Sequence, residues 1–190
     1  IKPELVADFK LSGIGIDNSV YANHATGNAM PDANRFGSGA NAFKFSGADT
    51  LIASNSVAYQ SNFTTISFWV KVNQLPAQGE VYLLSHGGWQ ERWKISLPSH
   101  GKPVFTTNST GGIKDMDSDS VALPLNSWRH VAMVHDSAGN RIFINGVLNP
   151  ATFAANPDGE ATAFNILVTS GLSLTAGDPG NVDFVVLHGA

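Results

Sequence analysis

The feature that most constrains this chain is a succession of short strand-like runs with no helical pattern. The runs are rich in β-branched and aromatic residues, and almost every gap between them holds Gly, Pro, Asn or Asp. No window of roughly a dozen residues combines apolar positions at helical spacing with capping residues. The sequence therefore predicts an all-β, two-sheet antiparallel jelly-roll sandwich with very little helix. The predicted strands are Leu5–Phe9, Ala42–Phe45, Ile66–Val72, Val81–Ser85, Trp93–Leu97, Val104–Thr107, His130–His135, Arg141–Ile144, Phe164–Val168 and Val182–Leu187.

Size and charge limit what such a sandwich can do. The 190 residues suit one domain, residues 1–190, and the net charge of -4 lacks the basic footprint that binding to nucleic acid requires. No apolar run approaches the roughly 20 residues that cross a bilayer, so we expect no membrane insertion. We expect a soluble chain whose export signal has been removed or lies outside this sequence. Cysteine is absent, which excludes disulfides and thiolate zinc sites.

Alternation along the strands separates a core face from an outer face. Trp69 falls on the mixed face of its strand, opposite the apolar positions on either side of it. Asn145 and Gly146 predict a tight hairpin turn, because both tolerate positive φ angles. The predicted core contains Phe43, Phe45, Ile66, Phe68, Val70, Ile142 and Ile144.

Four segments, in this order and spacing, resemble the laminin-G-like family of concanavalin A-like lectins and glucanases. They are Asn34–Gly47 (NRFGSGANAFKFSG), Phe63–Lys71 (FTTISFWVK), Ser127–Asp136 (SWRHVAMVHD) and Ile142–Gly146 (IFING). The resemblance extends over nearly the whole chain and implies the concanavalin A-like jelly roll. Because animal laminin G domains often carry disulfides, the absence of cysteine favours the bacterial branch.

The resemblance also implies a structural calcium ion on the convex side of the sandwich. The matching positions are Gly47, through its backbone carbonyl, and Asp183, through its carboxylate. Calcium accepts such mixed oxygen ligands. The alternative is an Asp183 side chain bonded to backbone amides. The acidic run 115–119 lacks the glycine and the distant glutamate of a calcium-binding loop and is interpreted as a solvated loop. His130 and His135 fall on opposite faces of one strand and cannot chelate together.

Paired carboxylates for hydrolysis of polysaccharides are missing. Glucanases of this fold carry an E-x-D-x-x-E strand, whose alternate residues place the nucleophile and the acid on one face. The chain has four glutamates, Glu4, Glu80, Glu91 and Glu160, and none is followed two residues later by Asp. We therefore expect the domain not to be an enzyme.

The segment His86–Lys94 is the chemically densest stretch of the chain. Sugar recognition combines an aromatic ring, which covers the C–H face of a pyranose, with planar polar groups that bind its hydroxyls. The alternative is that Trp89 caps the end of the sandwich. Trp69 and Trp128 match family positions that look structural and are assigned to packing. The predicted ligand-binding residues are His86, Trp89, Gln90, Glu91 and Arg92.

These patterns together predict a noncatalytic carbohydrate-binding domain of an exported or cell-surface protein. Its partner would be a polysaccharide or the glycan of a glycoconjugate, and its location secreted, periplasmic or at the bacterial cell surface. The alternatives are a structural or protein-adhesion module and a polysaccharide-degrading enzyme on the same fold. The last predicted strand lies close to Ala190, so either it closes a sheet or further domains of a longer parent protein follow.

Overall fold

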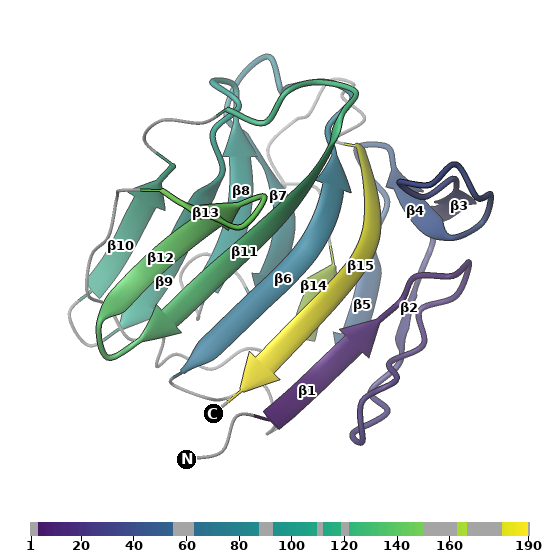
Figure 1. The fold of residues 1–190 in the computed structure, drawn as a ribbon, viewed down its shortest axis with the longest axis horizontal. Helices are drawn as coiled ribbons and strands as arrows, with labels where there is room; N and C mark the ends of the chain where they lie inside the picture. The colour runs from purple at the N-terminus through teal and green to yellow at the C-terminus, as the bar shows by residue number, and fades with distance from the viewer. Residues whose placement is uncertain are drawn as a thin grey trace.

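The computed structural model of the chain describes residues 4–54, 63–87, 93–109, 112–118, 122–149, 163–166 and 180–189. Every regular element in these residues is a β-strand, and neighbouring strands pair antiparallel. The strands form two sheets that pack face to face (Figure 1). The described part of the chain contains no helix long and apolar enough to cross a membrane.

The first sheet faces the viewer in Figure 1 and has eight of the described strands. Their order is β13-β12-β11-β6-β15-β4-β3, and β1 pairs with β15. The strands are β1 (Glu4–Phe9), β3 (Met30–Asp32), β4 (Ala42–Phe45), β6 (Thr64–Lys71), β11 (Trp128–Asp136), β12 (Gly139–Ile144), β13 (Val147–Leu148) and β15 (Gly180–Gly189).

The second sheet lies behind the first and has seven of the described strands, in the order β10-β9-β8-β7-β14-β5-β2. They are β2 (Ala25–Gly27), β5 (Leu51–Ser54), β7 (Glu80–His86), β8 (Trp93–Pro98), β9 (Val104–Ser109), β10 (Gly112–Asp117) and β14 (Ala163–Ile166).

Strand β15 joins the two halves of the first sheet by pairing on both of its edges. One of its edges pairs with β6, and its other edge pairs first with β4, where Gly180 lies opposite Phe45, and then with β1, where Gly189 lies opposite Glu4. The pairing with β6 is irregular between Val182 and Val185. The beginning of β1 and the end of β15 are therefore neighbours, as the arrows of these two strands show (Figure 1).

The core lies between the sheets and follows the predicted alternation. Ile66, Phe68 and Val70 of β6 point inward and are buried, while the residues between them are partly exposed. All seven predicted core residues are buried, so this prediction is confirmed. Removing each such side chain from water contributes about 1.5 to 3 kcal/mol. Trp93, Ile95 and Leu97 of β8 are the matching buried residues of the second sheet.

The predicted Asn145–Gly146 turn is present between β12 and β13. Asn145 has φ 51° and Gly146 has φ 79°, the two positive angles that a tight hairpin turn of this kind needs. The preceding hairpin connects Asp136 to Gly139, and Asp136 Oδ1 accepts a hydrogen bond of 2.8 Å from the Ala138 amide.

Five short strands were not predicted: β2, β3, β5, β10 and β13. The interpretation of run 115–119 as a solvated loop is wrong for its first three residues, which belong to β10. Its pairing with β9 turns Met116 into the core opposite Phe105 and leaves Asp115 and Asp117 exposed. Charged side chains on a short edge strand are common, because they discourage pairing with another chain.

Candidate functional site

The predicted ligand-binding segment connects β7 and β8, and His86 is the only one of its five predicted ligand-binding residues that is described. His86 is the last residue of β7, where it lies opposite Trp93. Its side chain is 0% exposed, and its ring lies edge-on to the Trp93 ring with 6.1 Å between centroids. The burial of this imidazole gives no support to the predicted contact between His86 and a ligand. Trp89, Gln90, Glu91 and Arg92 lie outside the described residues, and their role stays a prediction.

The two positions predicted to hold calcium are not side by side along the backbone. Gly47 follows the end of β4 with φ 64°, two residues beyond the Phe45–Gly180 pair. Asp183 comes one residue after Val182, which lies opposite Phe43 at the other end of the same pairing. All ligands of a calcium ion lie about 2.3 to 2.6 Å from it, so two ligands of one ion must be close together. The register does not place Gly47 and Asp183 opposite each other and therefore adds no support for a shared ion. Within the described part of the chain, no three His, Cys, Asp or Glu residues are grouped so that they could hold a metal ion.

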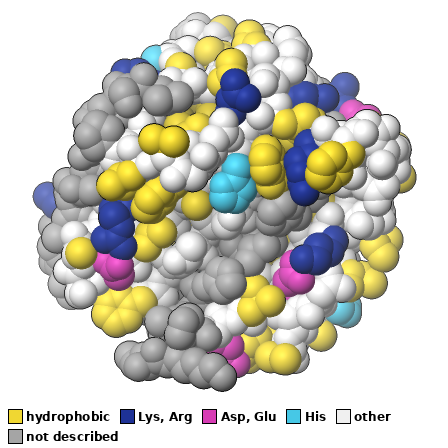
Figure 2. All heavy atoms as spheres, viewed as in Figure 1, with side chains coloured by type: hydrophobic (Ala, Val, Ile, Leu, Met, Phe, Trp, Pro, Cys, Tyr) yellow, Lys and Arg dark blue, Asp and Glu magenta, His cyan; other side chains and the backbone are white. Residues whose placement is uncertain are grey.

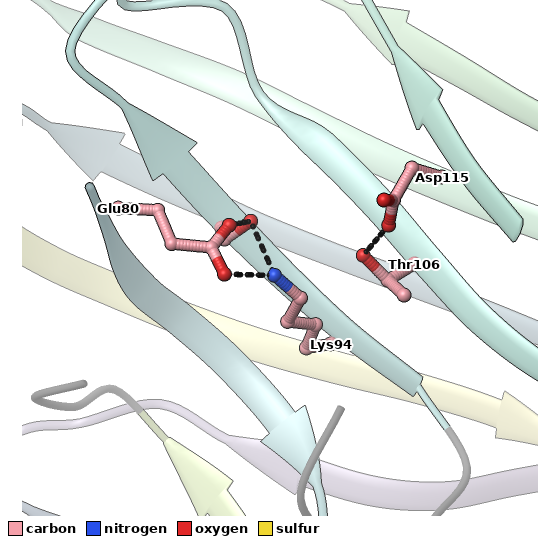
Figure 3. Close-up of polar contacts among 5 residues, drawn as sticks. Glu80, Lys94, Thr106 and Asp115 are labelled. Carbon is pink, nitrogen blue, oxygen red and sulfur yellow. Dashed lines mark hydrogen bonds and ion pairs between the residues drawn. The ribbon is translucent and has the colours of Figure 1, made fainter. Parts of the chain in front are cut away.

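A polar cluster occupies the outer face of the second sheet, on strands β7 to β10 (Figure 3). Lys94 Nζ forms an ion pair with Glu80 and lies 3.4 Å from Ser96 Oγ. Ser96 Oγ donates a 2.6 Å hydrogen bond to Glu80 Oε2. Lys94 reaches this face because it alternates with the inward-facing Trp93 and Ile95. It is only 6% exposed, so its charge depends on the Glu80 carboxylate.

Two further contacts extend the polar cluster. Thr106 Oγ1 donates a hydrogen bond to Asp115 Oδ1 (Figure 3). Lys94 Nζ lies 4.9 Å from the centre of the Tyr82 ring. Burial, and then the charges of Glu80 and Asp115, raise the pKa of Tyr82 to about 12, so its hydroxyl keeps its proton at neutral pH. The polar groups of this cluster bind one another, which favours a role in holding the four strands together.

The outer face of the first sheet carries a different group of side chains, which we call the aromatic–basic surface. Alternation turns the odd-numbered residues of β6 outward, and register places Trp69 opposite His130 and Lys71 opposite Trp128 on β11. Hydrophobic side chains gather beside histidine and basic side chains on this face (Figure 2). The surface consists of Arg35, Phe36, Trp69, Lys71, Trp128 and His130.

Cations lie over the aromatic rings of this surface. Arg35, from the turn between β3 and β4, has its guanidinium carbon 4.3 Å from the Phe36 ring centre and 4.8 Å from that of Trp69. Lys71 Nζ lies 5.5 Å from the ring centre of Trp128. Phe36 is 75% exposed. Each cation–ring contact of this kind contributes about 0.5 to 1 kcal/mol at an exposed site.

His130 is fixed in the middle of this surface. Its Nε2 is 2.7 Å from Ser67 Oγ, and its ring centre is 5.4 Å from that of Trp69. Burial, and then the nearby positive charge of Arg35, lower the pKa of His130 below its usual value. The neutral imidazole is therefore favoured, and it can exchange a hydrogen bond with a hydroxyl group.

The assignment of Trp69 and Trp128 to packing needs correction. Both side chains are partly exposed on the outer face of the sheet, and neither lies in the core. The signal was available for Trp69, since it alternates with the apolar residues Phe68 and Val70. Arg35 and Phe36 had no such signal, because a turn brings them to this face from a distant part of the sequence.

The aromatic–basic surface has the chemistry of a sugar-recognition site. Aromatic rings supply flat apolar area, while guanidinium, ammonium and imidazole groups can form hydrogen bonds with hydroxyl or carboxylate oxygens. Four of its six residues lie on the paired central strands β6 and β11, which hold these four side chains in fixed relation to one another.

Two antiparallel sheets packed face to face, with an aromatic outer face, define a lectin-like β-sandwich domain. The chain belongs to the Concanavalin A-like lectin/glucanases superfamily, whose family profile matches residues 45–188. The family resemblance and the fold class predicted from the sequence are therefore confirmed. No curated protein sequence matches the chain.

Solved structures share the fold at low sequence identity. Domain 4 of a GH43 extracellular arabinanase from Geobacillus stearothermophilus, in complex with arabinotriose, has a TM-score of 0.76 at 18% identity, covering 100% of this chain and 94% of that one. A structure of botulinum neurotoxin type C, whose cell entry depends on two ganglioside molecules, has a TM-score of 0.70 at 15% identity. The match covers 90% of this chain and 44% of the toxin chain. The binding domain of botulinum neurotoxin DC in complex with rat synaptotagmin II has a TM-score of 0.73 at 15% identity. That match covers 97% of this chain and 47% of the toxin chain. This chain spans about half of the toxin chains.

Proposed function

We propose that the chain is a noncatalytic carbohydrate-binding domain of an exported or cell-surface protein, with the aromatic–basic surface as its binding site. The observation that carries this proposal is the placement of Trp69, Trp128 and Phe36 on an outer sheet face, beside side chains that can bind hydroxyl groups. Burying these rings against protein would have served stability better, so partial exposure favours a binding role.

The structural neighbours support the proposal through what they bind. The arabinanase domain holds arabinotriose, and the type C toxin interacts with gangliosides. The toxin domain in complex with synaptotagmin supports the alternative function, in which the partner is a protein rather than a glycan. The arabinanase is extracellular, in line with the proposed export.

The arrangement of carboxylates supports a noncatalytic role. Glu80 on β7 and Asp115 on β10 share the outer face of the second sheet but lie three strands apart, roughly 14 Å at the usual strand spacing. Glu80 is bonded to Lys94 and Ser96, and Asp115 is bonded to Thr106. A displacement mechanism needs two carboxylates about 5 to 9 Å apart on either side of the scissile bond.

A glycan array with purified protein, repeated in EDTA, tests the proposal. Binding of one glycan class is the expected result, and its loss in EDTA would support the calcium predicted at Gly47 and Asp183. No binding to any glycan, together with binding to a protein ligand, would favour the adhesion alternative. Release of reducing sugar that depends on one named carboxylate would overturn the noncatalytic assignment.

Substitutions then locate the site. For a glycan found on the array, Trp128→Ala and Phe36→Ala should each weaken binding by about 1 to 3 kcal/mol, because each removes an aromatic contact. Tyr21→Ala is the matched control, since Tyr21 is a partly exposed aromatic whose hydroxyl binds Glu4, away from this surface. Calorimetry measures the affinities and thermal unfolding checks that each variant folds.

Trp89→Ala tests the segment predicted from sequence. If Trp89 stacks on the sugar, affinity falls and thermal stability is kept. If it caps the sandwich, stability falls by about 3 kcal/mol and affinity is kept. Retained affinity in Trp89→Ala, combined with loss in Trp128→Ala, would place binding on the first sheet alone.

A further inference from the structure

We propose that the aromatic–basic surface selects sugars that carry a carboxylate, that is, glycans containing uronic acid units. This inference rests on the proposed function and deepens it by naming the ligand class. The ring of the sugar would stack on an exposed aromatic side chain, and its carboxylate would bind the neighbouring cations, Lys71 foremost.

Lys71 is the first observation behind this inference. Its ammonium group lies over Trp128, and among the described residues this ring contact is its only side-chain interaction. Lys94, on the opposite sheet, shows the contrast, because its ammonium is nearly buried against the Glu80 carboxylate. A lysine held beside a partly exposed ring has an apolar face and a positive charge next to each other, which suits a uronate.

The geometry of Arg35 is the second observation. The guanidinium carbon lies 4.3 Å from the ring centre of Phe36 and 4.8 Å from that of Trp69, so these rings hold a second cation on the surface. The N–H groups of a guanidinium lie in one plane, where they match the two oxygens of a carboxylate. Arg35 therefore adds a group suited to carboxylates beside Trp69.

The third observation is the sign of charge across this surface. The titratable groups among its residues are Arg35, Lys71 and His130, all of them basic. Among described groups, the next carboxylate along β11 is Asp136, which is already paired with Arg141. The chain as a whole has a net charge of -4, so this basic grouping runs against the overall composition. A neutral glycan needs no such grouping, whereas a uronate gains from it.

The test compares two ligands whose carboxyl groups are charged in one and methylated, and so neutral, in the other. Trigalacturonate and its methyl ester share one sugar skeleton, and calorimetry is run in EDTA so that calcium bridging plays no part. The acid should bind at least about tenfold more tightly than the ester at about 50 mM salt, and the difference should shrink at about 500 mM, where screening is stronger. Equal affinities for acid and ester would overturn the inference and leave the proposed function standing.

Variants locate the effect on the surface. Lys71→Gln should lower affinity for the acid about tenfold and affinity for the ester far less, because the ester offers the ammonium no charged partner, and Arg35→Gln should act in the same direction. Lys114→Gln, which removes an exposed lysine of β10 on the other sheet, is the matched control and should change neither. Unchanged affinity in Lys71→Gln would overturn the inference. If no glycan of any kind binds, on the array or in solution, the proposed function itself fails.

Discussion

His130 makes the stability of the domain depend on pH. Burial and Arg35 from the turn between β3 and β4 lower its pKa, while its neighbours on β6, Ser67 and Trp69, carry no charge. The unfolded chain binds the proton near pH 6.5, and the folded chain binds it only at lower pH. Stability contributed by the neutral imidazole is therefore complete above about pH 6.5 and is lost as the pH falls toward the lower folded value.

Urea unfolding at about pH 8, 6.5 and 5 measures this effect. The wild-type midpoint should fall more steeply with acidification than that of His130→Gln, which keeps a hydrogen-bonding side chain without the titration. Parallel slopes for the two proteins would show that the imidazole does not titrate abnormally.

Single residues also show where prediction from sequence works. Alternation placed Trp69 on the outer face, because strand periodicity is a local property that neighbouring residues define. It did not reveal that Arg35 covers the same ring, since that contact joins residues 34 positions apart. The burial of His86 was not predicted, because the predicted strand ends at Ser85, whereas β7 continues to His86 and its register turns the imidazole inward.

At the scale of elements, the short strand β2 depends on a glycine. A Cβ at Gly27 would lie 1.8 Å from the carbonyl oxygen of Thr50, which belongs to the backbone and cannot move independently. Gly27→Ala should therefore destabilise the fold by about 2 kcal/mol or more, because the pairing of β2 with β5 has to open. Chemical denaturation measures the free energy of unfolding.

Gly39→Ala is the control for that substitution. Nothing lies within 4 Å of a Cβ at Gly39, and its φ is not in the strained positive range. It should leave stability unchanged or raise it by a few tenths of a kcal/mol, through lower entropy of the unfolded chain. A loss as large as that of Gly27→Ala would show that crowding at Thr50 is not the cause.

Elements differ in how visible they are in the sequence. The long central strand β6 alternates over all eight of its residues and β11 alternates from His130 onward, and the positions of both were predicted closely. Strands β2 and β3 have three residues each, too few for any period, and form because neighbouring strands offer them a partner. β10 was hidden by its charges, which its edge position tolerates.

On the scale of the whole molecule, a buried polar link connects the two sheets. Asn140 of β12 binds His135 of β11 through its side-chain oxygen, and its amide nitrogen donates a 3.2 Å hydrogen bond to Thr107 of β9. All three are buried. Because unsatisfied polar groups in a core are costly, this link favours one relative placement of the sheets over others.

Asn140→Leu should destabilise the domain by about 2 to 3 kcal/mol, since it leaves two buried polar partners without this contact. Thr107→Val removes one end of the same link. In urea unfolding, the double substitution should cost clearly less than the sum of the single ones, because both remove one shared hydrogen bond. Strict additivity would show that the two residues do not interact.

The pairing of β1 with β15 determines how the domain bears force. Glu4 lies opposite Gly189, so a load applied at the start of β1 and the end of β15 acts at two neighbouring points. Hydrogen bonds in an antiparallel pair run perpendicular to the strands. A load that pulls these two ends apart acts in the direction of the hydrogen bonds, so the bonds break one after another rather than together. A tether attached at those two ends would separate β1 first, while the pairing of β6 with β11 carries almost none of the tension.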